Sequence, residues 1–146
     1  METEWLILAD AAQVVGGKLY LLGGGWDILT VNSRLPFVHS FGIAAAFSVP
    51  WNETNQPRDV QMEIQNEDGE VLLTAGFRIE VGRPAGIPLG QAQRAQIAAN
   101  LGLEFQKVGG YVVVVRIEGQ DDRRFPFRLV PGAAQAAQQG RDEGRG

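Results

Sequence analysis

The sequence predicts an all-β protein: an antiparallel two-sheet β-sandwich of the immunoglobulin-like Greek-key type. Residues 37–49 place apolar side chains at every second position, which is the pattern of a strand with one buried face. The same alternation recurs along most of the chain, and Gly, Asn, Asp and Pro separate the runs. Two long connections among tight hairpins favour strands that cross between two sheets over an up-and-down barrel.

The N-terminal part of the chain predicts a hairpin. Strands over 5–15 and 18–22 flank Gly16 and Gly17, and a two-residue primed turn needs the positive φ that Gly adopts at little cost. Residues 23–25 are all Gly, which indicates a bulge or a close approach of another backbone. We expect the interrupted strand to resume over 26–31.

After the strand over 37–49, the middle of the chain predicts a second hairpin, with strands over 60–65 and 71–81 around an Asn66–Gly69 turn. Polar loops over 50–59 and 82–90 are the two long connections. The stretch 91–105 is ambiguous, because its Ala and Gln residues favour helix while its apolar residues recur at every second position. We predict a strand there, with a helix as the alternative.

The last hairpin is predicted from strands over 111–117 and 125–129 with a turn over 119–122. Pro126 cannot donate a ladder hydrogen bond, so it indicates an edge or bulged strand. Tyr111 opens a strand, as does the Tyr of immunoglobulin-like sandwiches whose hydroxyl bonds upstream backbone. The predicted core residues share the apolar side of these runs: Ile43, Phe47, Ile64, Leu73, Phe77, Leu101, Val113, Val115 and Phe127.

A chain of 146 residues fits one domain, which we place at 1–131. Residues 132–146 are Gly, Ala, Gln and balanced charges, so we expect a disordered tail that folding does not require. The sequence contains no Cys, which excludes disulfides and thiolate chemistry. An acidic start and short apolar runs predict no secretory signal and no membrane contact, and we expect a cytoplasmic protein. A net charge of −4 disfavours nucleic acid as a partner.

Three segments carry a family resemblance: Leu8-Ala9-Asp10-Ala11-Ala12, the stretch 17–27 with its Gly-Lys-Leu and Gly-Gly-Trp motifs, and the stretch 49–55. They resemble a group of small bacterial proteins that is catalogued as a domain of unknown function. The similarity covers roughly residues 5–130. It implies a bacterial, cytoplasmic, stand-alone β-domain, and it transfers no catalytic residues.

Trp51 is the most informative candidate for a binding residue, because an aromatic side chain in a polar loop either folds back onto the core or meets a partner. Asn52, Glu53 and Asn55 could supply polar recognition around it. Folding back is the favoured interpretation of Trp51. His39 is the only His, and an imidazole at the edge of the core is favoured over a catalytic base paired with Ser33, Ser40 or Ser48.

Charged residues give two weaker candidates. The acidic turn residues Asp59, Glu67, Asp68, Asp121 and Asp122 lack a calcium-loop spacing, so turn chemistry is favoured and we expect no metal site and no cofactor. Arg116, Arg124 and Arg128 form a predicted outer stripe, which Glu118, Asp121 and Asp122 are expected to neutralise.

The first strand is apolar on both sides, and no other segment is expected to cover its second side. The sequence therefore favours a noncatalytic interaction module that acts by self-association, as a homo-oligomer, or by binding another protein. The alternative is a domain that binds a sugar or another small molecule through the loop around Trp51. An enzyme with His39 as its base is the least favoured possibility.

Overall fold

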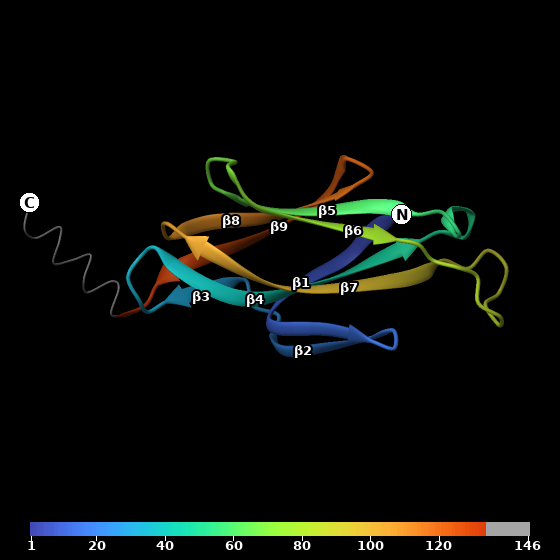
Figure 1. The fold of residues 1–146 in the computed structure, drawn as a ribbon, viewed down its shortest axis with the longest axis horizontal. Coiled ribbons are helices and arrows are strands. Elements are labelled where there is room, and N and C mark those ends of the chain that lie inside the picture. The colour runs from blue at the N-terminus through green and yellow to red at the C-terminus, as the bar shows by residue number, and fades with distance from the viewer. Residues whose placement is uncertain (134–146) are drawn as a thin grey trace, which may run out of the picture.

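The computed structural model describes residues 1–133 and contains two β-sheets that pack face to face (Figure 1). One sheet has four strands in the order β2-β1-β4-β7, and the other has five in the order β3-β9-β8-β5-β6. The strands are β1 (Glu2–Val15), β2 (Lys18–Gly24), β3 (Ile28–Val31), β4 (Phe37–Val49), β5 (Arg58–Asn66), β6 (Val71–Ile79), β7 (Gln93–Phe105), β8 (Gly109–Ile117) and β9 (Gln120–Pro131), with a 3-10 turn at Trp51–Glu53.

The predicted all-β, two-sheet fold is confirmed. The tail predicted over 132–146 falls, from residue 134 onward, outside the described residues.

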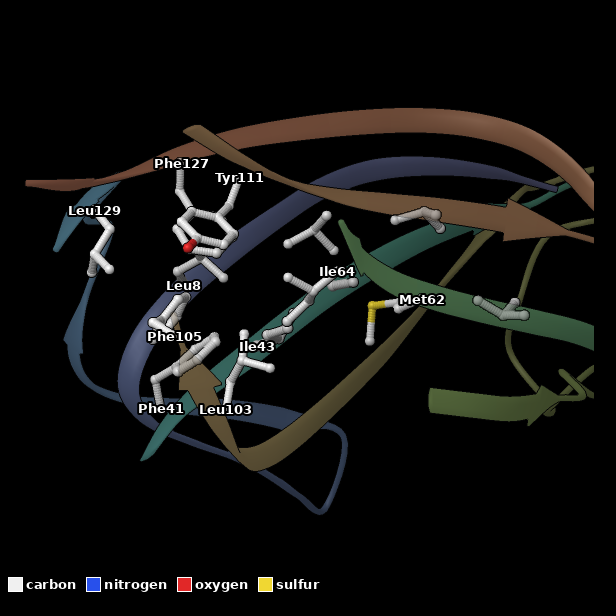
Figure 2. Packing of buried hydrophobic residues seen from close by; sticks show 14 of the residues in the cluster. Leu8, Phe41, Ile43, Met62, Ile64, Leu103, Phe105, Tyr111, Phe127 and Leu129 are labelled. Carbon is white, nitrogen blue, oxygen red and sulfur yellow. The ribbon is translucent and has the colours of Figure 1, made fainter. Parts of the chain in front are cut away.

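Six of the nine predicted core residues are buried in the hydrophobic core between the sheets, and the other three, Leu73, Phe77 and Leu101, are partly buried and pack against it. Aromatic rings fill one end of this core (Figure 2). The Tyr111 ring stacks on Phe127 at 5.5 Å and meets Phe105 edge-on at 5.0 Å. The Tyr111 hydroxyl donates a hydrogen bond to the carbonyl of Lys107, as the sequence predicted. Burial raises the pKa of Tyr111, which favours the protonated hydroxyl that donates this bond.

The ambiguous stretch is the strand β7, which confirms the prediction. It pairs with β4 along its whole length, from Phe37 opposite Phe105 to Val49 opposite Gln93. The ladder with β4 satisfies backbone groups of β7 and buries Leu103 and Phe105, and these gains outweigh the weak helical preference of Ala and Gln.

The glycine run at 23–25 does not interrupt a single strand, so that expectation was wrong. β2 ends at Gly24 in one sheet, whereas β3 pairs with β9 in the other. Gly23 has φ of +57°, and a Cβ there would lie 2.3 Å from the Asp10 carboxylate. The run is therefore the point at which the chain leaves the first sheet. The β3–β9 pair is parallel, which corrects the expectation of wholly antiparallel sheets.

The last strand corrects two further details. The turn before β9 is Glu118–Gly119, both with positive φ, so Asp121 and Asp122 lie within the strand instead of in the turn. β9 lies between β8 and β3, but β3 pairs with it only from Arg128 onward. The Arg128 N–H donates to the Asp27 carbonyl on the side of β9 that faces β3, and the nitrogen of Pro126, two residues earlier, points to the same side. β3 has not yet begun opposite Pro126, so no ladder hydrogen bond is lost there. The prediction was an edge or bulged strand, and both features are found locally: within residues 1–133 no strand pairs with that side of β9 at Pro126, and the register with β8 shifts between Arg123 and Asp121.

The first strand changes partners halfway. Its first half pairs with β4 as far as Ala9 opposite Gly42, and its second half pairs with β2. We call residues 10–24 the N-terminal hairpin. In Figure 1 this hairpin lies below β4 and β7, on the opposite side from the second sheet, with β2 at the outer margin.

Asn100 attaches the N-terminal hairpin to the sheet. Its side-chain amide on β7 accepts a hydrogen bond from the Ala12 nitrogen at 3.0 Å and donates one to the Ala12 carbonyl at 2.8 Å. The amide reaches across β4 at Gly42, where a Cβ would lie 2.8 Å from the Ala12 nitrogen. Gln96 adds a third contact by donating to the Gly17 carbonyl at 3.0 Å.

The outer face of the four-stranded sheet is more buried than the sequence suggested. Ala44 and Ala46 point away from the core, yet both are fully buried. Ile7 lies opposite Ala44 and Trp5 opposite Ala46, so the larger side chains of β1 flank the smaller ones of β4. The side chains of β1 therefore cover the outer face of β4, while Trp5 and Ile7 themselves stay half-buried.

We expect Gly42→Ala to lower the free energy of unfolding by about 1–3 kcal/mol, because the added methyl group meets backbone of the N-terminal hairpin and the Asn100 amide. Gly76→Ala is the matched control, since no atom lies within 4 Å of a Cβ there. Urea unfolding measures both. A Gly42→Ala protein as stable as the Gly76→Ala protein contradicts the close approach of the hairpin.

Candidate functional site

The N-terminal hairpin exposes an apolar surface. Val15, Tyr20 and Leu22 are 50%, 56% and 71% exposed. Tyr20 and Leu22 share one face of β2, and the ladder places Val15 on the same face of the neighbouring strand, opposite Lys18. We call these three residues the hairpin face. Neither the prediction of binding residues nor that of the core had singled them out, although the unbroken run Leu19–Leu22 was a usable signal.

The predicted Trp51 loop is tied to the segment that follows β6. The Arg83 guanidinium lies over the Trp51 ring, 4.1 Å from its centre, and donates to the Trp51 carbonyl at 2.9 Å and to Thr54 Oγ1 at 2.6 Å. Asn55, with φ of +59°, donates its backbone N–H to the Val81 carbonyl at 2.7 Å. The ring is half-buried beneath Arg83 but is not among the side chains that pack against the hydrophobic core, so the favoured interpretation, in which Trp51 folds back onto the core, stays a prediction.

The other predicted binding residues of this loop also have structural contacts. The Glu53 carboxylate pairs with the amino group of Met1 and lies 3.6 Å from Arg58. Asn52 is exposed and accepts a hydrogen bond on its carbonyl from Gln56 at 3.2 Å. The structure brings Trp51, Asn52, Glu53 and Asn55 together in one loop, and ligand binding by them stays a prediction.

His39 lies at the edge of the core. Its ring stacks between Phe37 and Phe41, with centroid distances of 5.5 and 6.1 Å, and its Nε2 has no hydrogen-bond partner within residues 1–133. Ser40 follows His39 directly, so its side chain points to the opposite face of β4. These positions agree with the favoured, structural interpretation of His39.

The predicted Arg stripe lies on the outer face of the second sheet and is paired with carboxylates. Arg116 pairs with Glu63 and with Asp121, and Arg124 lies 3.2 Å from Asp121. Farther along the face, Arg128 lies 3.9 Å from the Glu67 carboxylate. Two of the expected acidic partners accept hydrogen bonds from backbone N–H groups: Glu118 from Asp59 at 2.9 Å, and Asp122 from Thr3 at 2.7 Å.

The ion pairs on this face have a packing consequence. Val114 points away from the core but is fully buried, and its cross-strand neighbours are Glu63 and Arg124. The paired side chains therefore cover it with their stems. A hollow of about 600 Å³ lies on the same face, and its lining includes Ile28, Gln65, Glu67, Val112, Arg124 and Arg128. Its charged groups are of both signs, which favours no single ligand charge.

Two general features of the described residues bear on function. Within residues 1–133, no three His, Asp or Glu side chains gather in an arrangement that could hold a metal ion. The same residues form no helix of the length and apolar character needed to cross a membrane.

The Arg116 ion pairs predict a pH dependence of stability. The Arg116 guanidinium holds the pKa of Glu63 and of Asp121 below their ordinary values. A carboxyl group whose pKa is lower in the folded than in the unfolded state stabilises the fold at neutral pH. This contribution to the free energy of unfolding is lost as the pH falls through the folded-state pKa. We therefore expect Arg116→Met to be less stable than the unmodified protein at pH 7 and to approach it below about pH 4.

Chemical unfolding at pH 7 and pH 3 measures this difference. Arg78→Met is the control, because Arg78 is exposed on the same sheet and makes no ion pair with the described residues. A stability difference for Arg116→Met that is equal at both pH values rules out the ion-pair explanation.

A model of a family of unknown function, DUF6941, matches residues 4–130. These residues span β1 to β9 almost completely, so the match includes both sheets and the N-terminal hairpin. No curated protein matched the sequence. The predicted resemblance to a domain of unknown function is confirmed, and the chain belongs to the DUF6941 family of unknown function.

Proposed function

We propose that this protein is a noncatalytic β-sandwich module that acts by binding protein surfaces, first of all a second copy of itself, through the hairpin face. The observation that carries the proposal is the exposure of Val15, Tyr20 and Leu22 on one side of a two-stranded hairpin. Clustered apolar side chains on a soluble protein surface mark interaction sites more often than scattered ones do. Tyr is also enriched at the centres of interfaces.

The attachment of the hairpin supports the proposal. The side chains of Asn100 and Gln96 donate two hydrogen bonds to the hairpin and Asn100 accepts a third from it, so the hairpin face is presented on an element anchored to β7. A binding surface that is already ordered loses little conformational entropy on association. The outer face of the second sheet, by contrast, is covered by ion pairs in which Glu63 and Asp121 take part, and Glu and Asp side chains are depleted at interfaces.

We also infer the finer fold type and the location. The order β1-β4-β7 facing β9-β8-β5 corresponds to strands A-B-E facing G-F-C of an immunoglobulin-like sandwich, and Tyr111 on β8 makes the bond typical of the strand F Tyr. These features support an immunoglobulin-like Greek key. The absence of Cys is compatible with a reducing compartment, which supports a cytoplasmic protein, and the family resemblance supports a bacterial one.

We expect the mass of the protein in solution to rise above that of one chain as concentration increases from micromolar towards millimolar. The double variant Tyr20→Asp, Leu22→Asp removes the apolar contact and adds charge, so it should keep the monomer mass throughout. Val38→Asp is the matched control, since Val38 is 66% exposed at the far end of β4. Light scattering measures all three. A monomeric unmodified protein over the whole range contradicts self-association, as does equal loss of association in the control.

A further inference from the structure

The free edge of β2 is the backbone feature nearest to the hairpin face. Within residues 1–133, β2 pairs with β1 and with no other strand, and it lies at the outer margin of the molecule (Figure 1). Exposed edges in soluble proteins usually carry inward charges, Pro or bulges that prevent further pairing. β2 has Lys18 at its start and glycines at its end, and its centre Leu19–Leu22 carries none of these devices.

The ladder with β1 fixes which backbone groups of β2 are unpaired. Val15 and Lys18 flank the two-residue turn, so they form a hydrogen-bonded pair, and the alternation of antiparallel ladders makes Gln13 and Tyr20 the next one. The N–H and C=O groups of Leu19 and Leu21 therefore point away from β1, towards the open edge.

We propose that two copies of the protein pair through β2, antiparallel, across a two-fold axis at Tyr20. This inference rests on the proposed self-association and specifies its geometry. In this register Leu19 of each copy exchanges hydrogen bonds with Leu21 of the other, which uses the groups that point to the open edge. Tyr20 lies opposite its own counterpart in a pair without hydrogen bonds, where side chains approach most closely.

The side chains of β2 agree with this register. Leu19 lies opposite Leu21, and Lys18 lies opposite Leu22, so no like charges meet across the two-fold axis. Leu22 is the most exposed side chain of the hairpin face, and the aliphatic stem of Lys18 from the second copy would cover it. The two hairpins would form one continuous sheet, and the contact would be isologous, which closes at the dimer.

The absence of Cys makes the register directly measurable, because one introduced Cys per chain gives an unambiguous cross-link. In this register the two Tyr20 Cα atoms lie about 4.5 Å apart, within the range that forms disulfides. Tyr20→Cys should therefore link to itself in a glutathione buffer, whereas Lys18→Cys and Leu22→Cys should not, since their own counterparts lie roughly 13 Å away. An equimolar mixture of Lys18→Cys and Leu22→Cys chains should link, because these two positions face each other.

The experiment compares the rates of dimer formation on non-reducing gels with the light-scattering mass of the same samples. Tyr20→Cys alone and the mixture should each form the disulfide-linked dimer about tenfold or more faster than Lys18→Cys, Leu22→Cys or the exposed control Val38→Cys alone. If the chains associate by mass but Val38→Cys or Leu22→Cys links to itself as fast, the register is wrong and the proposed function stands. If every sample stays monomeric, both are wrong.

Discussion

The amide of Asn100 holds the N-terminal hairpin in place, and the surface properties of the protein depend on that attachment. Its two hydrogen bonds satisfy both backbone groups of Ala12, and the missing side chain of Gly42 leaves room for the approach. A residue with a side chain at position 42 would push the hairpin away from β7. A side chain at position 100 that cannot both donate and accept a hydrogen bond would weaken the attachment. The hairpin face and the β2 edge would then be attached to a mobile arm instead of an anchored one.

The two outer faces of the sandwich cover their outward-pointing apolar side chains in different ways. On the second sheet, Val114 is covered by charged side chains that pair with one another, which leaves a hydrated surface. On the first sheet, small residues of β4 are covered by larger residues of β1 and by the turn into the N-terminal hairpin. That second arrangement moves the uncovered apolar surface outward to Tyr20 and Leu22, and this is why the proposed interaction lies there.

The first two strands were predicted from apolar runs on either side of Gly16 and Gly17. Alternating hydrophobicity was sufficient to predict the strands from residue 37 onward, because one buried face imposes a period of two. It even identified β7 against its helical composition. Which strands pair with one another could not be predicted so well. Nothing in residues 26–31 themselves indicates that β3 joins the second sheet and pairs in parallel with β9. The Asn100 contact was also hidden, since it joins residues far apart in sequence through backbone atoms that carry no sequence signal. The polar loop of Trp51 was noticed, but its cover by Arg83 depends on the path of a distant segment.

Native-state hydrogen exchange of an Asn100→Asp variant tests the central claim most directly, because Asp keeps the size and the acceptor oxygen but loses the donor to the Ala12 carbonyl. Exchange should accelerate about tenfold or more at hairpin amides such as Ala12 and Tyr20, while amides of the central strand β8, such as Val113 and Val115, keep their protection. Unchanged exchange in the hairpin, or equal acceleration in β8, would contradict the view that Asn100 attaches this hairpin to an otherwise independent sandwich.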